Sequence, residues 1–149
     1  MVPELRPVDK NNRDEVASIV ALVSKNYPGT AWPFTAESVM DPQKIFFKAY
    51  VNGEFIGMTG IAFKTPTLAE TIKTIVLQEF RGKNYGKSLS LVVEEECRKR
   101  GVKKVMTTIY ADNHSMIAIK LAQSYTIEGY HPDHEAPGFH EYSLGKILR

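Results

Sequence analysis

The sequence predicts an α/β fold in which helices pack on a mixed β-sheet, and two observations carry this prediction. Segments with the helical period alternate with short segments typical of strands, in the order β-α-α-β-β-β-α-β-α-β. The chain has 149 residues, of which 43% are hydrophobic and 24% charged, the balance of one globular domain with its own core. We therefore expect residues 1–149 to form a single domain.

The first forty residues predict one short strand and two helices. The strand is expected at Leu5–Val8. A helix is expected from Arg13 to Asn26, where hydrophobic residues recur at offsets of 0, 3, 4 and 7, and Pro28 and Gly29 stop it. A second, shorter helix is expected at Thr35–Met40, with Thr35 as its N-cap. The hydrophobic face of the first helix consists of Val16, Ile19, Val20 and Val23.

Three strand candidates follow and predict an antiparallel meander. Lys44–Val51 and Glu54–Phe63 flank Asn52-Gly53, which favours a tight hairpin because both residues accept a positive φ. A break at Thr65–Thr67 precedes the third strand, Glu70–Leu77.

The rest of the chain predicts two more helices and two more strands. A helix begins near Gly86 and ends at Gly101. Its hydrophobic stripe is Leu89, Val92, Val93 and Cys97, and Glu94 and Glu95 each precede a basic residue by four positions. The remaining elements are a strand at Lys104–Tyr110, a helix at Met116–Tyr125 with Ile117, Leu121 and Tyr125 on one side, and a last strand at His140–Leu148.

Composition excludes several classes of protein. Nineteen Lys and Arg against seventeen Asp and Glu leave a net charge of +2, too small for a dedicated nucleic-acid binder. The single Cys97 cannot form an internal disulfide, which suits a reducing compartment. No stretch approaches the roughly 20 apolar residues of a membrane span, and the first residues lack the apolar stretch of a signal peptide. We expect a cytoplasmic protein that binds neither nucleic acid nor membrane.

Features of an anion site are concentrated in Gln78–Ser88, between the third strand of the meander and the next helix. Gly82 and Gly86 permit a close approach of the backbone to a ligand, and Asn84 tolerates the left-handed conformation. The N-terminus of the following helix presents unpaired N–H groups and the positive end of its dipole. Positive side chains are added by Arg81, Lys83 and Lys87. We expect a phosphate-bearing ligand here, with a solvated basic turn as the alternative.

A nucleotide-binding P-loop is a second alternative for the same residues. Gly86-Lys87-Ser88 matches the end of G-x-x-x-x-G-K-[ST], but the first glycine of that motif would fall at position 81, which is arginine. The short antiparallel hairpin before the loop is also the wrong setting for a nucleoside triphosphatase with a parallel sheet. These residues therefore disfavour a P-loop.

Arg81-Gly-Lys-Asn-Tyr-Gly86 resembles the Arg/Gln-x-x-Gly-x-Gly/Ala motif of the GNAT superfamily of N-acetyltransferases, with Asn84 in the place of the first motif glycine. Asn113–Tyr125 is similar to a second family motif, Asn-x-x-Met-Leu-Ala-Ile-Asn-x-x-Leu-Gly-Phe. The element order agrees over the whole chain. The resemblance implies a mixed, mostly antiparallel central sheet flanked by helices on both faces, and acetyl-CoA as co-substrate. Because Asn also accepts a positive φ, we expect the loop to keep its shape.

By this resemblance, the strand before the loop binds the pantetheine arm of acetyl-CoA through its backbone, and the loop binds the pyrophosphate. The N–H of Val76 is the expected donor to the thioester oxygen, where negative charge develops during attack. Asn113 is expected to contact the cofactor or to cap its helix. The cofactor-binding residues expected are Ile75, Val76, Leu77, Arg81, Gly82, Lys83, Asn84, Tyr85, Gly86, Lys87, Ser88 and Asn113.

Two side chains are candidates for proton transfer. Glu70 lies eleven positions before Arg81, the separation of the base glutamate from its motif in the histone-acetylating branch of the family. The alternative is a surface glutamate that opens a strand. Many relatives place a tyrosine acid seven positions after the residue that matches Asn113, where this chain has Lys120. Lys120 is either a proton donor whose pKa is lowered by burial, a phosphate ligand or a solvated lysine. Tyr110 and Tyr125 are stand-ins for the acid.

The acceptor side is expected near the loop His131–His140. In relatives this region borders the acceptor, and acidic and aromatic residues there predict a pocket for a cationic amine. A zinc site is disfavoured because His-x-x-His without cysteine is a weak metal signature, so we expect no metal. The pocket residues expected are Trp32, Phe34, Asp133, Glu135 and Glu141.

These expectations combine into one function and one alternative. The chain is predicted to move an acetyl group from acetyl-CoA to a primary amine, either a small molecule or a peptide, by direct attack in a ternary complex. The alternative is a non-catalytic module that binds acyl-CoA, supported by a lysine in the tyrosine position. The sequence is compatible with a monomer or a homodimer.

Overall fold

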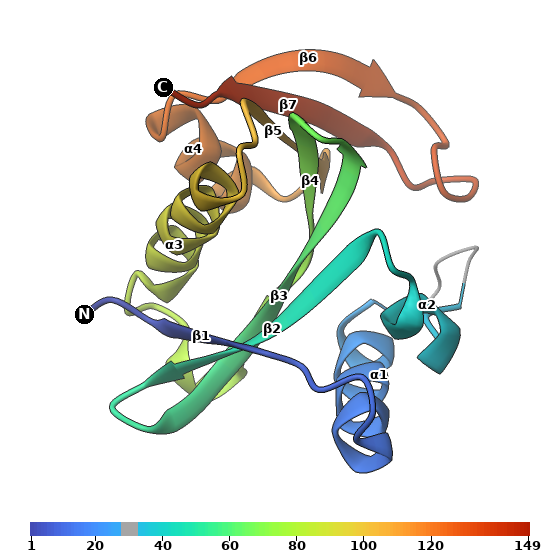
Figure 1. Ribbon diagram of the computed structural model, residues 1–149. Coiled ribbons are helices and arrows are strands. Elements are labelled where there is room, and N and C mark those ends of the chain that lie inside the picture. The colour runs from blue at the N-terminus through green and yellow to red at the C-terminus, as the bar shows by residue number, and fades with distance from the viewer. Residues whose placement is uncertain (28–32) are drawn as a thin grey trace.

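The computed structural model describes residues 1–27 and 33–149, which form one mixed sheet between two layers of helices (Figure 1). The strands are β1 (Glu4–Pro7), β2 (Lys44–Val51), β3 (Glu54–Thr65), β4 (Leu68–Val76), β5 (Lys104–Tyr110), β6 (Thr126–His131) and β7 (Glu141–Ile147). The helices are α1 (Arg13–Asn26), α2 (Ala36–Met40), α3 (Tyr85–Lys99) and α4 (His114–Ala122), with a short 3-10 helix η1 (Gln78–Phe80).

The sheet has the order β1-β2-β3-β4-β5-β7-β6, and only the central pair β4–β5 is parallel. That pair joins Leu68–Glu70 to Lys104–Met106 and no further. Beyond Glu70 the two strands separate, which is visible as the opening between the two halves of the sheet in Figure 1. The predicted mixed, mostly antiparallel sheet is confirmed.

A bulge in β4 accompanies this separation. Opposite the single residue Thr59 of β3, β4 places two residues, Lys73 and Thr74. Lys73 has a φ of 51°, in the left-handed region that non-glycine residues rarely adopt. A bulge bends its strand and increases the local twist, so it turns the end of β4 away from β5.

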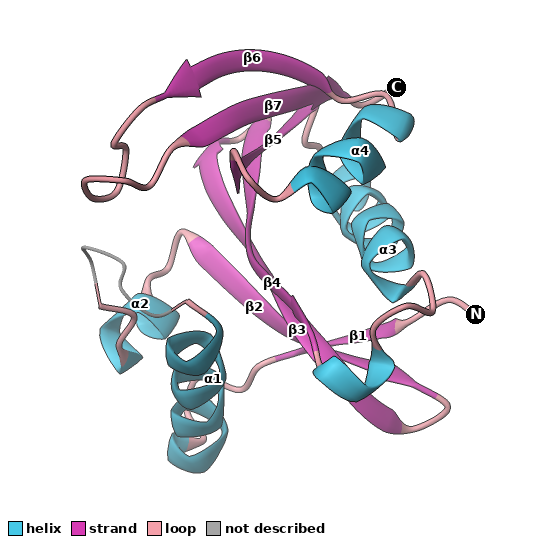
Figure 2. Ribbon diagram, turned by 180° about the vertical axis from the view of Figure 1, so that it is seen from behind, coloured by secondary structure: helices cyan, strands magenta, loops and turns pink. Residues whose placement is uncertain are grey.

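Helices cover both faces of the sheet, α1 and α2 on one and α3 and α4 on the other (Figures 1 and 2). Side chains alternate between the faces along a strand, and the neighbours Phe46 and Phe47 of β2 accordingly lie in different cores. The core beneath α1 and α2 contains Val16, Ile19, Val23, Val39, Phe46, Met58 and Ile75. The core beneath α3 and α4 contains Phe47, Ile61, Val93, Cys97, Val105, Tyr125 and Leu144.

Several predicted boundaries are confirmed and two expectations are wrong. The structure reproduces Arg13–Asn26, Lys44–Val51 and Lys104–Tyr110; the predicted stop at Pro28-Gly29 lies outside the described residues. The predicted order lacked the strand Thr126–His131, which forms the edge of the sheet beside β7. None of the helices in the described part of the chain is long and apolar enough to cross a membrane.

The last helix ends earlier than predicted. It stops at Ala122, because Ser124 has a φ of 70° and the Tyr125 N–H turns back to the Lys120 carbonyl at 3.0 Å. Tyr125 is therefore buried in the core beyond the helix, while Leu121 of the predicted hydrophobic side is 46% exposed. A left-handed residue just after a helix is a common terminator, but here it is a serine, which the sequence does not signal.

Candidate active site

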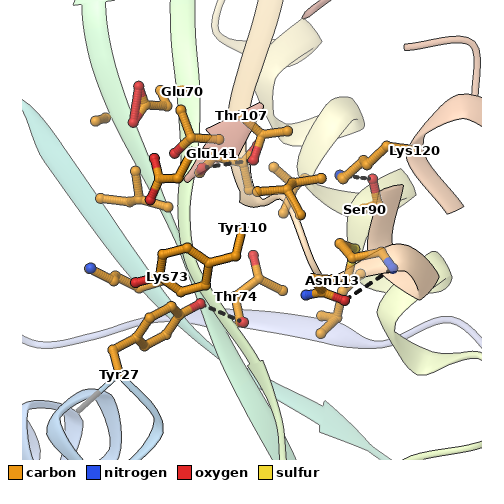
Figure 3. A pocket seen from close by; sticks show the side chains of 18 of the residues that line it. Tyr27, Glu70, Lys73, Thr74, Ser90, Thr107, Tyr110, Asn113, Lys120 and Glu141 are labelled. Carbon is orange, nitrogen blue, oxygen red and sulfur yellow. Dashed lines mark hydrogen bonds between the residues drawn. The ribbon is translucent and has the colours of Figure 1, made fainter. Parts of the chain in front are cut away.

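A cavity of about 380 Å³ occupies the place where β4 and β5 separate. Residues 70–74 of β4 and 107–110 of β5 form its walls. On one side it is lined by residues of α3 and α4, and on the other by residues near α1 and α2 and by the segment before β7. Figure 3 shows these side chains converging from both halves of the sheet. The cavity thus extends from one helical layer to the other.

The backbone of Val76 is directed toward the open side of β4. The N–H of Leu77 donates to the Ile56 carbonyl of β3 at 2.8 Å, and backbone groups of successive residues point to opposite sides of a strand. The N–H and carbonyl of Val76 consequently point away from β3, and that carbonyl accepts a hydrogen bond from Arg81 Nε at 2.9 Å. The backbones of Ile75 and Leu77 face β3 instead.

The predicted anion loop leads into the N-terminus of α3. Asn84 has φ 63° and ψ 16°, so the expected left-handed conformation at this position is confirmed. Asn84 is the N-cap, and its side chain makes no capping hydrogen bond. An added Cβ at Gly82 would meet nothing within 4 Å among the described residues, so the loop borders open space. This geometry leaves the first turn of a 15-residue helix available to an anion.

The loop side chains divide into two groups. Arg81 is held by the Val76 carbonyl and by Asn26 Oδ1, at 2.9 and 3.4 Å. Lys83 and Lys87 are exposed, with the Lys83 ammonium 5.7 Å from the centre of the Phe80 ring. Tyr85 and Ser88 support the turn, since the Tyr85 ring packs on Phe80 and Ser88 Oγ donates to the Asn84 carbonyl at 3.2 Å. Gly86 lines the cavity.

Lys120 is buried in the cavity wall and is not a solvated lysine, which removes that alternative. It is 6% exposed, and its Nζ donates to Ser90 Oγ at 2.6 Å (Figure 3). Burial lowers the pKa of Lys120 to about 8, with Lys146 acting in the same direction and Glu94 opposing both. Near neutral pH this group both holds and releases a proton.

Asn113 lies in the cavity wall and also caps α4. Its Oδ1 accepts from the Met116 N–H at 3.3 Å, so the capping alternative is confirmed. Because Asn113 also lines the cavity, it stays a candidate for contact with the cofactor.

Carboxylates gather on the opposite side of the cavity. Glu70 lines it from β4, with an ion pair to Lys64 at 3.9 Å. Glu141 opens β7 and is 4% exposed; burial, then the nearby Glu135, raise its pKa. Tyr110 of β5 donates to Glu135 Oε2 at 3.1 Å, and burial followed by Glu135 raises its pKa. These acidic groups suit a cationic ligand.

The remaining acceptor-side predictions have different outcomes. Phe34 lines the cavity and packs edge-on against Phe46, with 5.5 Å between ring centres. Asp133 does not line the cavity: it is exposed, accepts from the Gly138 N–H at 2.7 Å and lies 3.8 Å from His140 Nδ1. Its expected place in the pocket is therefore wrong, because its carboxylate is used to close the loop. Trp32 lies outside the described residues.

Three residues that line the cavity were not predicted from the sequence. Tyr27, just after α1, donates from its hydroxyl to the Thr74 carbonyl at 3.3 Å, and burial raises its pKa to about 12. Lys73 extends from the bulge, with its ammonium 4.6 Å from the centre of the Tyr27 ring. Ser90, buried on α3, holds Lys120. A lysine at a left-handed bulge position and a serine within a hydrophobic helical stripe are recognisable only after folding.

Comparison with known proteins identifies the chain's family. The model of the acetyltransferase (GNAT) family matches residues 16–122. This chain belongs to the GNAT acetyltransferase family. An uncharacterized N-acetyltransferase from Chlorobaculum tepidum is 33% identical over 98 residues, which are 64% of this chain and 63% of that protein. The matched region thus spans just under two thirds of that relative.

Solved GNAT structures share the fold. Ard1 from Thermoplasma volcanium has a TM-score of 0.80 at 16% identity, over 100% of this chain and 99% of that one. Spermidine N-acetyltransferase from Vibrio cholerae, in complex with CoA and spermine, has a TM-score of 0.80 at 13% identity, over 97% and 95%. An aminoglycoside 6'-N-acetyltransferase complexed with coenzyme A has a TM-score of 0.74 at 19% identity, over 100% and 99%. The predicted GNAT-like fold is confirmed.

Proposed function

We propose that this chain transfers the acetyl group of acetyl-CoA to a primary amine by direct attack in a ternary complex. The cavity between β4 and β5 carries this proposal, because it joins the α3 side of the molecule to a carboxylate-lined side. Two substrates that enter from opposite sides would meet where the strands separate. Membership of the GNAT family supports acetyl-CoA as the donor, and two of the compared structures hold CoA.

In this proposal the pyrophosphate of acetyl-CoA binds at the loop and first turn of α3. The exposed ammonium groups of Lys83 and Lys87 and the backbone N–H groups from Gly82 to Lys87 supply the contacts. The pantetheine arm runs beside residues 75–77, where the Val76 N–H points to the open side of the strand. Asn113 borders the arm from the start of α4. No metal takes part.

A protonated acceptor must lose two protons, one before attack to free its electron pair and one after attack, and one proton must reach sulfur. The acceptor nitrogen attacks the thioester carbonyl carbon, and the Val76 N–H stabilises the negative charge on its oxygen. Glu70 takes the first of these protons from the amine, directly or through water, and the second passes to solvent. The carbon–sulfur bond then breaks, sulfur keeps the electron pair, and the ammonium of Lys120 donates its proton to it. The products are an acetamide and free CoA.

The acceptor in this proposal is a cationic amine. Glu141 is buried in the cavity wall, where burial and then Glu135 raise its pKa while His134 and Lys73 act in the opposite direction. A buried carboxylate is stabilised by an ammonium group. Glu135, oriented by Tyr110, adds a second acidic group at the same end of the cavity.

The test is release of free CoA from acetyl-CoA in the presence of a panel of amines. The panel contains diamines, amino sugars, antibiotics with amino groups and peptides with free N-termini, each beside an uncharged analogue that lacks the amine. We expect at least one amine to release CoA together with an equal amount of acetylated product. The uncharged analogues are expected to release none.

Thermal stability measured with acetyl-CoA and with ATP separates this proposal from the alternatives. Acetyl-CoA is expected to raise the melting temperature, and ATP is not. Stabilisation by acetyl-CoA without CoA release by any amine would favour the non-catalytic acyl-CoA-binding module. Stabilisation by ATP alone would contradict both.

A further inference from the structure

A buried group of charged and polar side chains lies behind Lys120. Ser90 and Glu94 come from successive turns of α3, Lys120 from α4 and Lys146 from β7. Ser90, Glu94 and Lys120 are 6%, 1% and 6% exposed. Ionisable side chains are seldom buried so completely unless their charges are paired. Glu94 was expected only as one of the regularly spaced acidic residues on its helix.

The charges in this group are paired unevenly. Glu94 Oε2 accepts from Lys146 Nζ at 2.9 Å and lies 3.8 Å from the Arg98 guanidinium. Glu94 Oε1 is buried and has no hydrogen-bond partner within the described residues. The Lys120 ammonium has Ser90 Oγ as its close partner, and no carboxylate of the described residues lies within 4.0 Å of it. The charge of Lys120 is thus compensated only from a distance.

The ammonium groups of both lysines lie near the ring of Tyr125. The Lys120 ammonium lies 4.7 Å and the Lys146 ammonium 5.8 Å from the centre of this ring. The ring faces favour cations, but they do not neutralise them. The charged or titratable groups in this cluster besides Lys120 are Glu94, Cys97 and Arg98 on α3, Tyr125 beyond α4 and Lys146 on β7.

We propose that Ser90, Glu94 and Lys146 are positioning residues that act through Lys120 to deliver a proton to the sulfur of CoA. This inference rests on the proposed function, in which Lys120 is the acid. Ser90 fixes the direction of the ammonium on the cavity wall. Glu94 favours the protonated lysine, and Lys146 favours its loss of the proton.

The proton balance of this step is simple. As the carbon–sulfur bond breaks, sulfur keeps the bonding electrons and takes one proton from Lys120, which becomes a neutral amine. Solvent returns a proton to Lys120 before the next turnover. Because burial lowers the pKa of Lys120 toward that of a thiol, about 8.5, Lys120 donates a proton to sulfur more readily than an exposed lysine would.

The first test follows the titration of Lys120 directly in the free protein, by NMR of isotope-labelled lysine side chains. The signal is assigned with Lys120→Arg. We expect Glu94→Gln and Ser90→Ala to lower the titration midpoint, Glu94→Gln by about one pH unit, and Lys146→Gln to raise it. Glu95→Gln, an exposed neighbour on α3, serves as the matched control and leaves the midpoint in place. Equal midpoints in wild type and all variants would overturn the inference.

The second test measures the rate against pH with an accepted amine. The high-pH decline of kcat is expected to move down in Glu94→Gln and up in Lys146→Gln, while Glu95→Gln keeps the wild-type curve. A uniform loss of kcat with an unmoved decline would show a merely structural role and overturn the inference, provided that circular dichroism shows the variants folded. A wild type that releases no CoA would instead overturn the proposed function, and the NMR midpoints would still test the coupling.

Discussion

Lys120 shows why the burial of a single side chain is difficult to predict from the sequence. For Lys120 the sequence left a solvated lysine as one of three alternatives. Because the helix ends at Ala122, Tyr125 turns back over Lys120 and buries it. Its burial depends on a turn at Ser124, where no glycine signals the turn, and its role as the acid stays a prediction.

Glu70 is the residue for which pH gives the clearest test. If it accepts the proton of the amine, Glu70→Gln removes the base that is needed most at low pH, where the acceptor is largely protonated. We expect kcat/KM to fall about a hundredfold near pH 6.5 and to recover toward the wild-type value above about pH 9. The measurement is the pH–rate profile of folded variant and wild type.

Glu54→Gln is the control for that variant, since Glu54 is exposed at the start of β3, by the hairpin turn. Its profile is expected to match the wild type. Loss of the ion pair between Glu70 and the half-exposed Lys64 alone would change stability by about 0–1 kcal/mol and leave the profile in place. A Glu70→Gln profile parallel to that of the wild type would remove Glu70 from the reaction.

Among the elements, the loop and the start of helix α3 were predicted closely. Their residues signal their own backbone: Asn84 takes the left-handed conformation, and the helix starts one residue before the predicted Gly86. The edge strand β6 was not predicted. None of the residues in Thr126–His131 is buried, so the segment lacks the alternation of hydrophobic and polar residues that indicates a strand. Strands that depend on a neighbour for their pairing leave a weak signal in the sequence.

Removal of the positive side chains of this loop is expected to lower the affinity for CoA selectively. In the double variant Lys83→Ala/Lys87→Ala, two exposed positive charges beside the expected pyrophosphate are removed. We expect the dissociation constant for CoA to rise about tenfold at low salt, and less at high salt where the charges are screened. The measurement is isothermal titration calorimetry.

Pantetheine, which lacks the pyrophosphate, is the matched ligand for this prediction, and its affinity is expected to stay the same. Lys99→Ala, at the other end of α3, is the matched variant and should bind CoA like the wild type. An equal loss of affinity for CoA and pantetheine would place the pyrophosphate elsewhere.

At the scale of the whole molecule, the small net charge of +2 conceals an uneven distribution. The loop and first turn of α3 carry Arg81, Lys83 and Lys87, whereas the opposite side of the cavity carries Glu70, Glu135 and Glu141 together with Lys44, Lys64 and Lys73. The separation of β4 and β5 joins the two sides. In the proposed function, the basic side attracts the pyrophosphate of acetyl-CoA, and the acceptor meets both carboxylates and lysines on the other side.

The proposed mechanism requires that acetyl-CoA and the amine occupy this opening at the same time. Initial rates measured over a grid of acetyl-CoA and amine concentrations test it most directly. We expect double-reciprocal lines that intersect, because acetyl transfer requires the ternary complex. Parallel lines, together with radiolabelled acetyl groups retained on the protein in the absence of amine and released when amine is added, would indicate a covalent acetyl-enzyme and contradict it.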